Sequence, residues 1–218
     1  RAKRGDARLE TLIIAARDQG IAVQYSRRES LDKLAGPQNQ GVVARARPRS
    51  AGDEQALAAH LDGLDHPPLL LILEGVTDPH NLGACLRSAD AAGVDAVVVP
   101  RRHAAGLTPV ACRSAAGAAE ALAYFEVGTL ARVLEMLKDR RIQVAGTALN
   151  ERSQSLFDYR PEAALAVVMG AEGEGLRRLT LERCDDLVAI PMAGDVQSLN
   201  VSVATGVVLF HVRAALAR

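Results

Sequence analysis

A stretch near the end of the chain, LAVVMGAEGEGL at residues 165–176, decides the fold. Its first five residues are apolar, as in a strand buried on both faces of a parallel sheet. Three glycines and two glutamates follow at residues 170–175, and glycines let the backbone approach a ligand closely. A glycine-rich turn is also common as a plain connection after a strand. The stretch therefore predicts an α/β fold first and a ligand site only in company with other features.

The same alternation of apolar strands and helices extends over the chain from residue 69 onward. Apolar runs predict strands at residues 69–73, 96–99, 143–146, 165–169 and 187–190. Helical patterns follow them at residues 82–92, 109–118, 129–139, 176–183 and 201–217. Continuous apolar strands that alternate with helices predict a parallel sheet with helices on both faces.

Residues 1–47 predict a small α/β unit of their own. Helical spacing at residues 9–16 ends before Gly20, a short helix is expected at residues 30–34, and short strands at residues 21–25 and 41–46. The unit is too short for a core of normal size, and the chain does not begin with Met. We therefore expect its opening elements to be missing. Residues 48–67 predict a linker with a connecting helix, and residues 68–218 the main domain.

Composition narrows the class of protein. The chain has 49% hydrophobic residues and no apolar run of the length that a membrane span needs. Its charged N-terminus lacks the apolar stretch of a signal peptide. Three widely spaced cysteines (Cys85, Cys112 and Cys184) favour buried reduced thiols, and the five histidines show no metal-ligand spacing. We expect a cytoplasmic protein that holds no metal and contacts no membrane.

The basic residues are clustered although the formal net charge is zero. Zero net charge argues against a protein that coats nucleic acid nonspecifically, but local clusters can still form one positive face. Aromatic residues make up only 3% of the chain, with no Trp, which disfavours base-stacking platforms. The clusters indicate either phosphate contacts or solvated surface arginines: Arg45/Arg47/Arg49, Arg101-Arg102-His103, Arg140-Arg141 and Arg177-Arg178.

Two more polar loops follow predicted strands. In the first, EGVTDPHNLG at residues 74–83, Asn81 occupies a plausible helix-cap position and Arg87 projects from the helix beyond. In the second, PMAGDVQSLNV at residues 191–201, Ser198 and Asn200 are natural caps before an apolar helix. Each of these residues also has a purely structural explanation. Asn81, Ser198 and Asn200 can be helix caps, and Arg87 can be a surface arginine. Together the three loops predict one ligand site at an edge of the sheet, where free helix amides can hold an anion.

Familiar nucleotide and hydrolase motifs are absent from the sequence. It contains no G-x-x-x-x-G-K-[ST], its glycines at residues 170–175 do not match G-x-G-x-x-G, and no G-x-S-x-G occurs. Composition and spacing alone therefore lead to an α/β domain with a ligand site and no further.

Three motifs resemble those of the SPOUT-class RNA ribose 2′-O-methyltransferases. They are DPHNLGA continuing to Arg87, MGAEGEG at residues 169–175, and IPM at residues 190–192 with SLNVS at residues 198–202. They occur in the family's order over residues 69–218, about two thirds of the chain. The long matches DPHNLGACLRSADAAG and VMGAEGEGLRRLT are most similar to bacterial members that methylate a guanosine ribose in 23S rRNA.

The resemblance implies S-adenosylmethionine as the methyl donor, a homodimer, and a C-terminal trefoil knot, which pattern reasoning alone does not suggest. It also implies that residues 1–47 are the remainder of a ribosomal-protein-like RNA-binding domain. The cofactor pocket would be lined by backbone around Gly170, Ile190 and Leu199, with Thr147 as a further contact. The catalytic and substrate-orienting positions would be Asn81, Arg87, Glu172, Ser198 and Asn200.

The resemblance assigns removal of the 2′-hydroxyl proton to Arg87. An arginine is protonated far above neutral pH and is a poor base. We therefore favour a role in which Arg87 stabilises the developing alkoxide electrostatically.

Two other functions use the same fold. Ribose methylation of tRNA relies on the same three motifs, and only the small N-terminal domain and the long matches favour rRNA. A non-catalytic RNA-binding or ribosome-assembly factor would be expected to lack Arg87 or Glu172, and both are present. The expected substrate is 23S rRNA, either free or within a ribosome-assembly intermediate.

Overall fold

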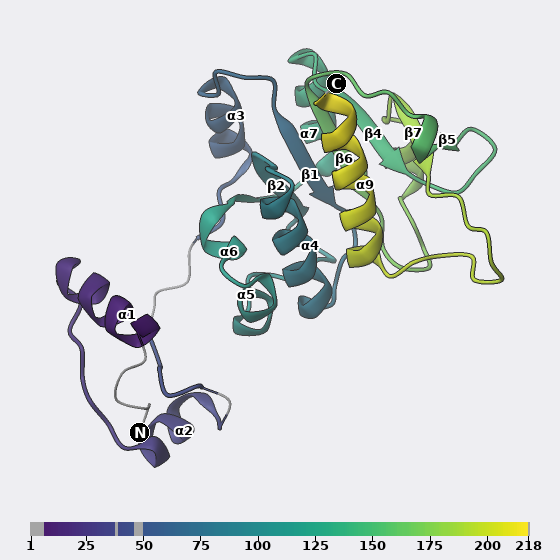
Figure 1. Cartoon of the computed structure of the whole chain (residues 1–218). Coiled ribbons are helices and arrows are strands. Elements are labelled where there is room, and N and C mark those ends of the chain that lie inside the picture. Colours follow the sequence, from purple (N-terminus) through teal and green to yellow (C-terminus); the bar gives the residue numbers. More distant parts are fainter. Residues whose placement is uncertain (1–6, 38, 46–49, 218) are drawn as a thin grey trace. The chain divides into compact units, whose positions relative to one another are not determined.

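The computed structural model describes residues 7–37, 39–45 and 50–217. The chain divides into two units, Arg1–Pro48 and Arg49–Arg218 (Figure 1). The larger unit holds the sheet and every strand that the structure describes. Each unit is considered separately.

The larger unit is built on a seven-stranded parallel sheet, in the order β3-β2-β1-β6-β4-β7-β5. The strands β1 and β6 lie at its centre with Leu69 opposite Leu165 and Leu73 opposite Met169, and both are buried along their whole length. The strands are β1 (Leu69–Leu73), β2 (Ala96–Pro100), β3 (Ala123–Val127), β4 (Gln143–Thr147), β5 (Gln154–Ser155), β6 (Leu165–Met169) and β7 (Asp186–Ala189).

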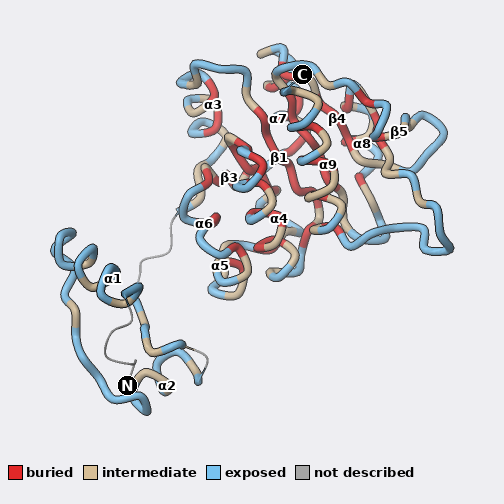
Figure 2. The backbone as a smooth tube through the Cα atoms, in the orientation of Figure 1, coloured by how far each residue is buried: buried red, intermediate tan, exposed pale blue. Residues whose placement is uncertain are grey.

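Helices cover both faces of this sheet, as the sequence predicts. Alternate residues of β1 enter two different cores: Leu71 packs with α4, α5 and α9, whereas Leu70 packs with α3 and α7. Figure 2 shows the buried residues between these layers. The helices are α3 (Glu54–Asp62), α4 (Pro79–Ala91), α5 (Pro109–Ala115), α6 (Ala118–Ala121), α7 (Leu130–Asp139), α8 (Arg178–Leu181) and α9 (Val201–Leu216), with a 3-10 turn at Leu156–Asp158.

Two strands of the sheet were not predicted. The strand β3 contains the half-buried Ala123 and Glu126, so its sequence lacks the continuous apolar run of a central strand. The strand β5 has only two residues and pairs with β7 alone. Both strands lie at the edges of the sheet, where the burial pattern that reveals a strand is weakest.

The smaller unit contains helices α1 (Ala7–Asp18) and α2 (Arg28–Ala35). Gly20, with φ +68°, ends α1 as predicted. The predicted strands are wrong: residues 21–25 and 41–45 form no strand, and Ala46 lies outside the described residues. Strands need partners and a buried face, and no residue among 7–37 and 39–45 is buried.

All three cysteines lie in the larger unit. Cys85 and Cys184 are buried and Cys112 is half-buried, and all three are free thiols. Burial raises the pKa of Cys85 to about 11, so that thiol stays protonated at neutral pH.

Among the residues that the structure describes, no helix is both long and apolar enough to cross a membrane. The same residues contain no group of three or more His, Cys, Asp or Glu side chains that could hold a metal ion.

Candidate active site

Three loops meet at the carboxyl edge of the sheet. They leave β1, β6 and β7, and the carboxyl ends of parallel strands share one edge. Residues from the first two loops line one cavity, and residues from the last two line another. The prediction that the three polar loops converge is confirmed.

A hydrogen-bonded cluster joins one residue from each loop. The amide nitrogen of Asn200 donates to Oδ1 of Asn81 at 2.9 Å and to Oε1 of Glu172 at 2.6 Å. The same Glu172 oxygen accepts from the backbone N–H of Val201 at 3.1 Å. A carboxylate at the start of α9 is favoured by the helix dipole and by the free amides of the first turn. Asn81, Glu172 and Asn200 therefore form one connected group.

Helix α4 leaves Asn81 free to take part in this cluster. The helix begins at Pro79 and is capped by Asp78, whose side chain accepts from the backbone N–H of His80 at 3.0 Å. The predicted cap at Asn81 and the predicted start at residue 82 are therefore wrong. The Asp-Pro pair supplies both the cap and the first helical residue.

Helix α9 is capped by Asn200, one of the two residues predicted for this role. Oδ1 of Asn200 accepts from the backbone N–H of Ser202 at 3.0 Å and from its hydroxyl at 2.6 Å. Asn200 thus uses its oxygen for the helix and its nitrogen for Asn81 and Glu172. Ser198 lies before the cap, and its side chain has no hydrogen-bond partner among the described residues.

The first cavity, about 600 Å³, lies between the loops after β6 and β7. Its lining includes all four residues that the resemblance implies for the cofactor, Thr147, Gly170, Ile190 and Leu199, together with Ser198. A Cβ at Gly170 would collide with the backbone of Gly175 and lie 2.6 Å from the nitrogen of Leu176. The size and the exposed main chain fit a small-molecule site.

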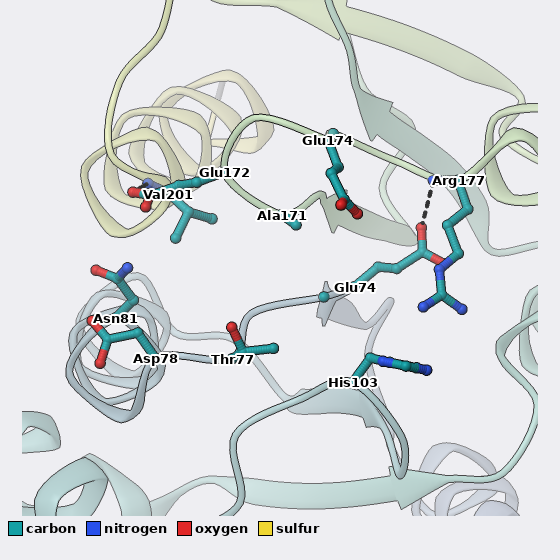
Figure 3. A pocket seen from close by; sticks show the side chains of 12 residues that line it. Glu74, Thr77, Asp78, Asn81, His103, Ala171, Glu172, Glu174, Arg177 and Val201 are labelled. Carbon is teal, nitrogen blue, oxygen red and sulfur yellow. Dashed lines mark hydrogen bonds between the residues drawn. The ribbon is translucent and has the colours of Figure 1, made fainter.

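The second cavity, about 700 Å³, adjoins the first and is strongly charged. Asn81 and His103 line it together with the charged residues Glu74, Asp78, Glu172, Glu174 and Arg177 (Figure 3). The two cavities share Ala171, Glu172, Glu174, Gly175 and Val201, which form the wall between them. Glu172 therefore faces both spaces.

Glu74 is a buried residue in the lining of the charged cavity. It is 5% exposed, and its carboxylate accepts from the backbone N–H of Arg177 at 3.0 Å and from the hydroxyl of Thr180 at 2.9 Å. Both carboxylate oxygens are used, as buried charge requires. Glu74 therefore holds the end of the glycine-rich loop in place.

Within a single chain, Arg87 lies away from the cluster of Asn81, Glu172 and Asn200. It is exposed on α4, lines neither cavity, and has no hydrogen bond or ion pair among the described residues. Asn81 and Arg87 are six residues apart, which places them about 240° from each other around a helix. The five proposed catalytic positions therefore separate into a joined group of three, Ser198 in the neighbouring cavity, and Arg87 outside.

Most residues that line the charged cavity were not predicted as site residues, among them His103, Glu174 and Arg177. In the sequence, His103 and Arg177 are recognisable only as members of basic clusters, and Glu174 only as part of the glycine-rich motif. The basic clusters were the available indication, but a cluster does not reveal which member faces a cavity.

Known families and relatives match most of this chain. The SpoU rRNA Methylase family profile matches residues 68–210, and a profile described as RNA 2'-O ribose methyltransferase substrate binding matches residues 1–51. A relative from Photobacterium profundum, 23S rRNA (guanosine-2'-O-)-methyltransferase RlmB, is 51% identical over 209 residues, which cover 95% of this chain and 84% of the relative.

Solved structures have the same fold. The SpoU methyltransferase AviRb from Streptomyces viridochromogenes, in complex with AdoMet, has a TM-score of 0.66 and 28% identity over 76% of this chain and 65% of its own. The A. aeolicus TrmH/SpoU tRNA modifying enzyme has a TM-score of 0.61 and 26% identity over 74% of this chain and 81% of its own. The extent of the family match and the identity to the relative show that this chain belongs to the SpoU rRNA methylase family.

Proposed function

We propose that this protein transfers a methyl group from S-adenosylmethionine to the ribose 2′-hydroxyl of a guanosine in 23S rRNA. One observation carries the proposal: Asn81, Glu172 and Asn200 are joined where two cavities meet, and one cavity is lined by all the expected cofactor residues. The named activity of the 51% identical relative supports the substrate.

The residues of this chain would act mainly by positioning. When bound, S-adenosylmethionine supplies a methyl group already activated by the sulfonium charge. Asn81 and Glu172 border the cavity on the other side of the shared wall, where they would orient the ribose hydroxyl. Orientation of two reactants accounts for much of such a rate. Arg87 would stabilise the negative charge that develops on the 2′-oxygen.

The lining of the first cavity supports its choice for the cofactor. Gly170 lies on this lining, and the absence of a Cβ there lets the backbone of Gly175 and Leu176 pack directly against it, which closes the loop tightly beside the cavity. Ile190 and Leu199 add apolar surface, and Thr147 is oriented by a hydrogen bond from its hydroxyl to the carbonyl of Val168 at 3.1 Å.

A homodimer is part of the proposal. Helix α9 exposes Val203 and Phe210, which are 53% and 52% accessible and lie on the same side of the helix. A symmetric pair would cover such an apolar face with the same face of a second copy. Since Arg87 lies outside both cavities of its own chain, we assign it to the site of the partner.

The domain assignment follows from the same family. Residues 1–47 would bind RNA, residues 48–67 would connect, and residues 68–218 would carry out methyl transfer within a C-terminal trefoil knot. The substrate-binding profile at residues 1–51 supports the first assignment. An rRNA substrate, free or in an assembly intermediate, and three unpaired cysteines support a cytoplasmic location.

Ribose methylation of tRNA is the second candidate. A tRNA modifying enzyme of the same fold has a TM-score of 0.61 to this chain, so the fold alone does not separate the two substrates. A non-catalytic RNA-binding role is less well supported, because the cluster of Asn81, Glu172 and Asn200 is intact.

The test is methyl transfer from labelled S-adenosylmethionine to unmethylated 23S rRNA and to tRNA transcripts, followed by mapping of the modified nucleotide. We expect one labelled guanosine in 23S rRNA and none in tRNA. Label in tRNA alone would replace the proposed substrate. No label in either RNA, together with no cofactor binding by calorimetry, would refute the enzymatic function.

A further inference from the structure

The charged cavity contains three side chains that neither the fold nor the proposed chemistry uses. Glu174, His103 and Arg177 line it, and Glu174 points into it from the glycine-rich loop (Figure 3). All three are exposed, and none of their side chains has a hydrogen bond or ion pair within the described part of the chain. Glu74, in contrast, uses both of its oxygens inside the protein. The three are therefore available to a ligand.

The turn at residues 171–175 directs its two carboxylates to different places. It is closed by a hydrogen bond from the backbone N–H of Gly175 to the carbonyl of Ala171 at 3.0 Å, and Gly173 and Gly175 adopt φ of +79° and +66°. These left-handed positions favour glycine. Both glutamates line both cavities, but Glu172 accepts hydrogen bonds at the start of α9, whereas the carboxylate of Glu174 has no partner among the described residues. One carboxylate is thus held by the protein and the other is free.

The position of the charged cavity determines which ligand it would receive. It shares a wall with the cavity proposed for the cofactor, and Asn81 and Glu172 border it at that wall. On the proposed function, on which this inference rests, the ribose of the target nucleotide must lie at the shared wall. Its base and its phosphates then extend into the charged cavity.

We propose that Glu174 recognises the base of the target nucleotide as guanine. A carboxylate only accepts hydrogen bonds, and guanine presents two adjacent donors on its Watson–Crick edge, N1–H and the 2-amino group. Adenine and cytosine place an acceptor beside their amino group on that edge, and uracil flanks its single N–H with carbonyl oxygens. Enzymes that act on an exposed nucleotide commonly read this edge.

Two basic side chains complete the nucleotide pocket. Arg177 and His103 line the same cavity as Glu174 and have no protein partner for their side chains among the described residues. A guanidinium is well suited to a phosphate, since its N–H groups form paired hydrogen bonds with phosphate oxygens. The carboxylate would therefore select the base, and Arg177 with His103 would hold the RNA backbone.

The test compares guanosine with inosine, which lacks only the 2-amino group. The mapped target guanosine is replaced by inosine in an rRNA fragment, and kcat/KM is measured for both RNAs. The wild type should prefer guanosine on the order of 10-fold, because a charged acceptor loses one partner. Glu174→Gln should methylate guanosine more slowly and bring the two rates within about twofold of each other. Because Glu174 also lines the cavity proposed for the cofactor, both RNAs are compared at saturating S-adenosylmethionine.

Controls separate base recognition from a general loss of activity. Glu162→Gln changes an exposed glutamate outside both cavities and should keep the wild-type preference. Glu174→Asp keeps the charge with a shorter reach and should show an intermediate preference. This variant gives a second measurement of the preference for guanosine over inosine if Glu174→Gln proves unstable in thermal unfolding.

Three outcomes would overturn the assignment. The first is a wild type that methylates guanosine and inosine equally. The second is Glu174→Gln slowing both RNAs while keeping their ratio, and the third is the variant changing neither rate. In each case wild-type methyl transfer shows that the proposed function still holds. A wild type that neither binds S-adenosylmethionine nor methylates RNA would instead refute the proposed function, and with it this inference.

Discussion

Glu172 has two partners for a single oxygen, Nδ2 of Asn200 at 2.6 Å and the backbone N–H of Val201 at 3.1 Å. Glu172 and Asn200 are nonetheless exposed, so water can reach the Asn200 amide if the carboxylate is removed. The contribution of Glu172 to stability is therefore small compared with the contribution proposed for it in methyl transfer.

We predict that Glu172→Ala separates these two contributions. The free energy of unfolding should fall by about 1 kcal/mol, because the exposed Asn200 amide regains water as a partner. The rate of methyl transfer should fall on the order of 100-fold, as when a preorganised group at a reacting centre is lost. Urea unfolding and methyl transfer at saturating cofactor measure the two effects. Glu162→Ala, outside both cavities, is the control, and a wild-type rate in Glu172→Ala would exclude Glu172 from the site.

Only the site residues that lie within a recognisable motif could be predicted from the sequence. Asn81, Glu172 and Asn200 stand within motifs that resemble one family, and the structure joins them. His103 lies in the left-handed region, with φ +59°, in the segment after β2 and outside those motifs. Its place in the charged cavity depends on how β2 and β1 pair, which a linear pattern does not contain.

At the scale of elements, the loop after β6 depends on the absence of a side chain at Gly170. A Cβ there would meet the backbone of Gly175 and Leu176, and backbone atoms cannot move aside as a flexible side chain can. By contrast, a Cβ at Gly194, in the loop before α9, meets nothing within 4 Å.

We predict that Gly170→Ala displaces the loop at residues 170–176 and weakens cofactor binding at least about 10-fold, because overpacking of a tight contact forces the backbone to shift. Gly194→Ala should bind the cofactor as the wild type does. Calorimetric titration with S-adenosylmethionine measures both variants. Equal affinity in Gly170→Ala and the wild type would show that the first cavity is not the cofactor site.

The central elements of the fold were predictable and the peripheral ones were not. The strands β1 and β6 are buried on both faces, and such burial demands the apolar runs that the sequence displays. The edge strands β3 and β5 carry partly exposed residues and therefore lack that pattern. In residues 21–25 and 41–45, apolar side chains such as Ile21 and Val42 remain exposed, so strand-like sequence there forms no strand.

For the whole molecule, the position of Arg87 is the feature that a single chain leaves unexplained. It is exposed, and it lies outside the cavities that contain the other proposed catalytic residues. A second copy docked on the apolar face of α9, around Val203 and Phe210, could bring Arg87 of one chain to Glu172 of the other. Each site would then be built from two chains.

Mixing two inactive variants tests this shared site. If Arg87 acts across the dimer, a dimer of one Arg87→Ala chain and one Glu172→Ala chain has one site with both residues intact. Random mixing makes half of the dimers mixed, so roughly a quarter of wild-type activity should return. If Arg87 acts within its own chain, every site in the mixed dimer lacks one residue and the mixture stays inactive. Mixing during refolding or co-expression allows the chains to exchange, and each variant alone gives the baseline. Activity restored only in the mixture would therefore show both that the protein is a dimer and that Arg87 works in the site of its partner.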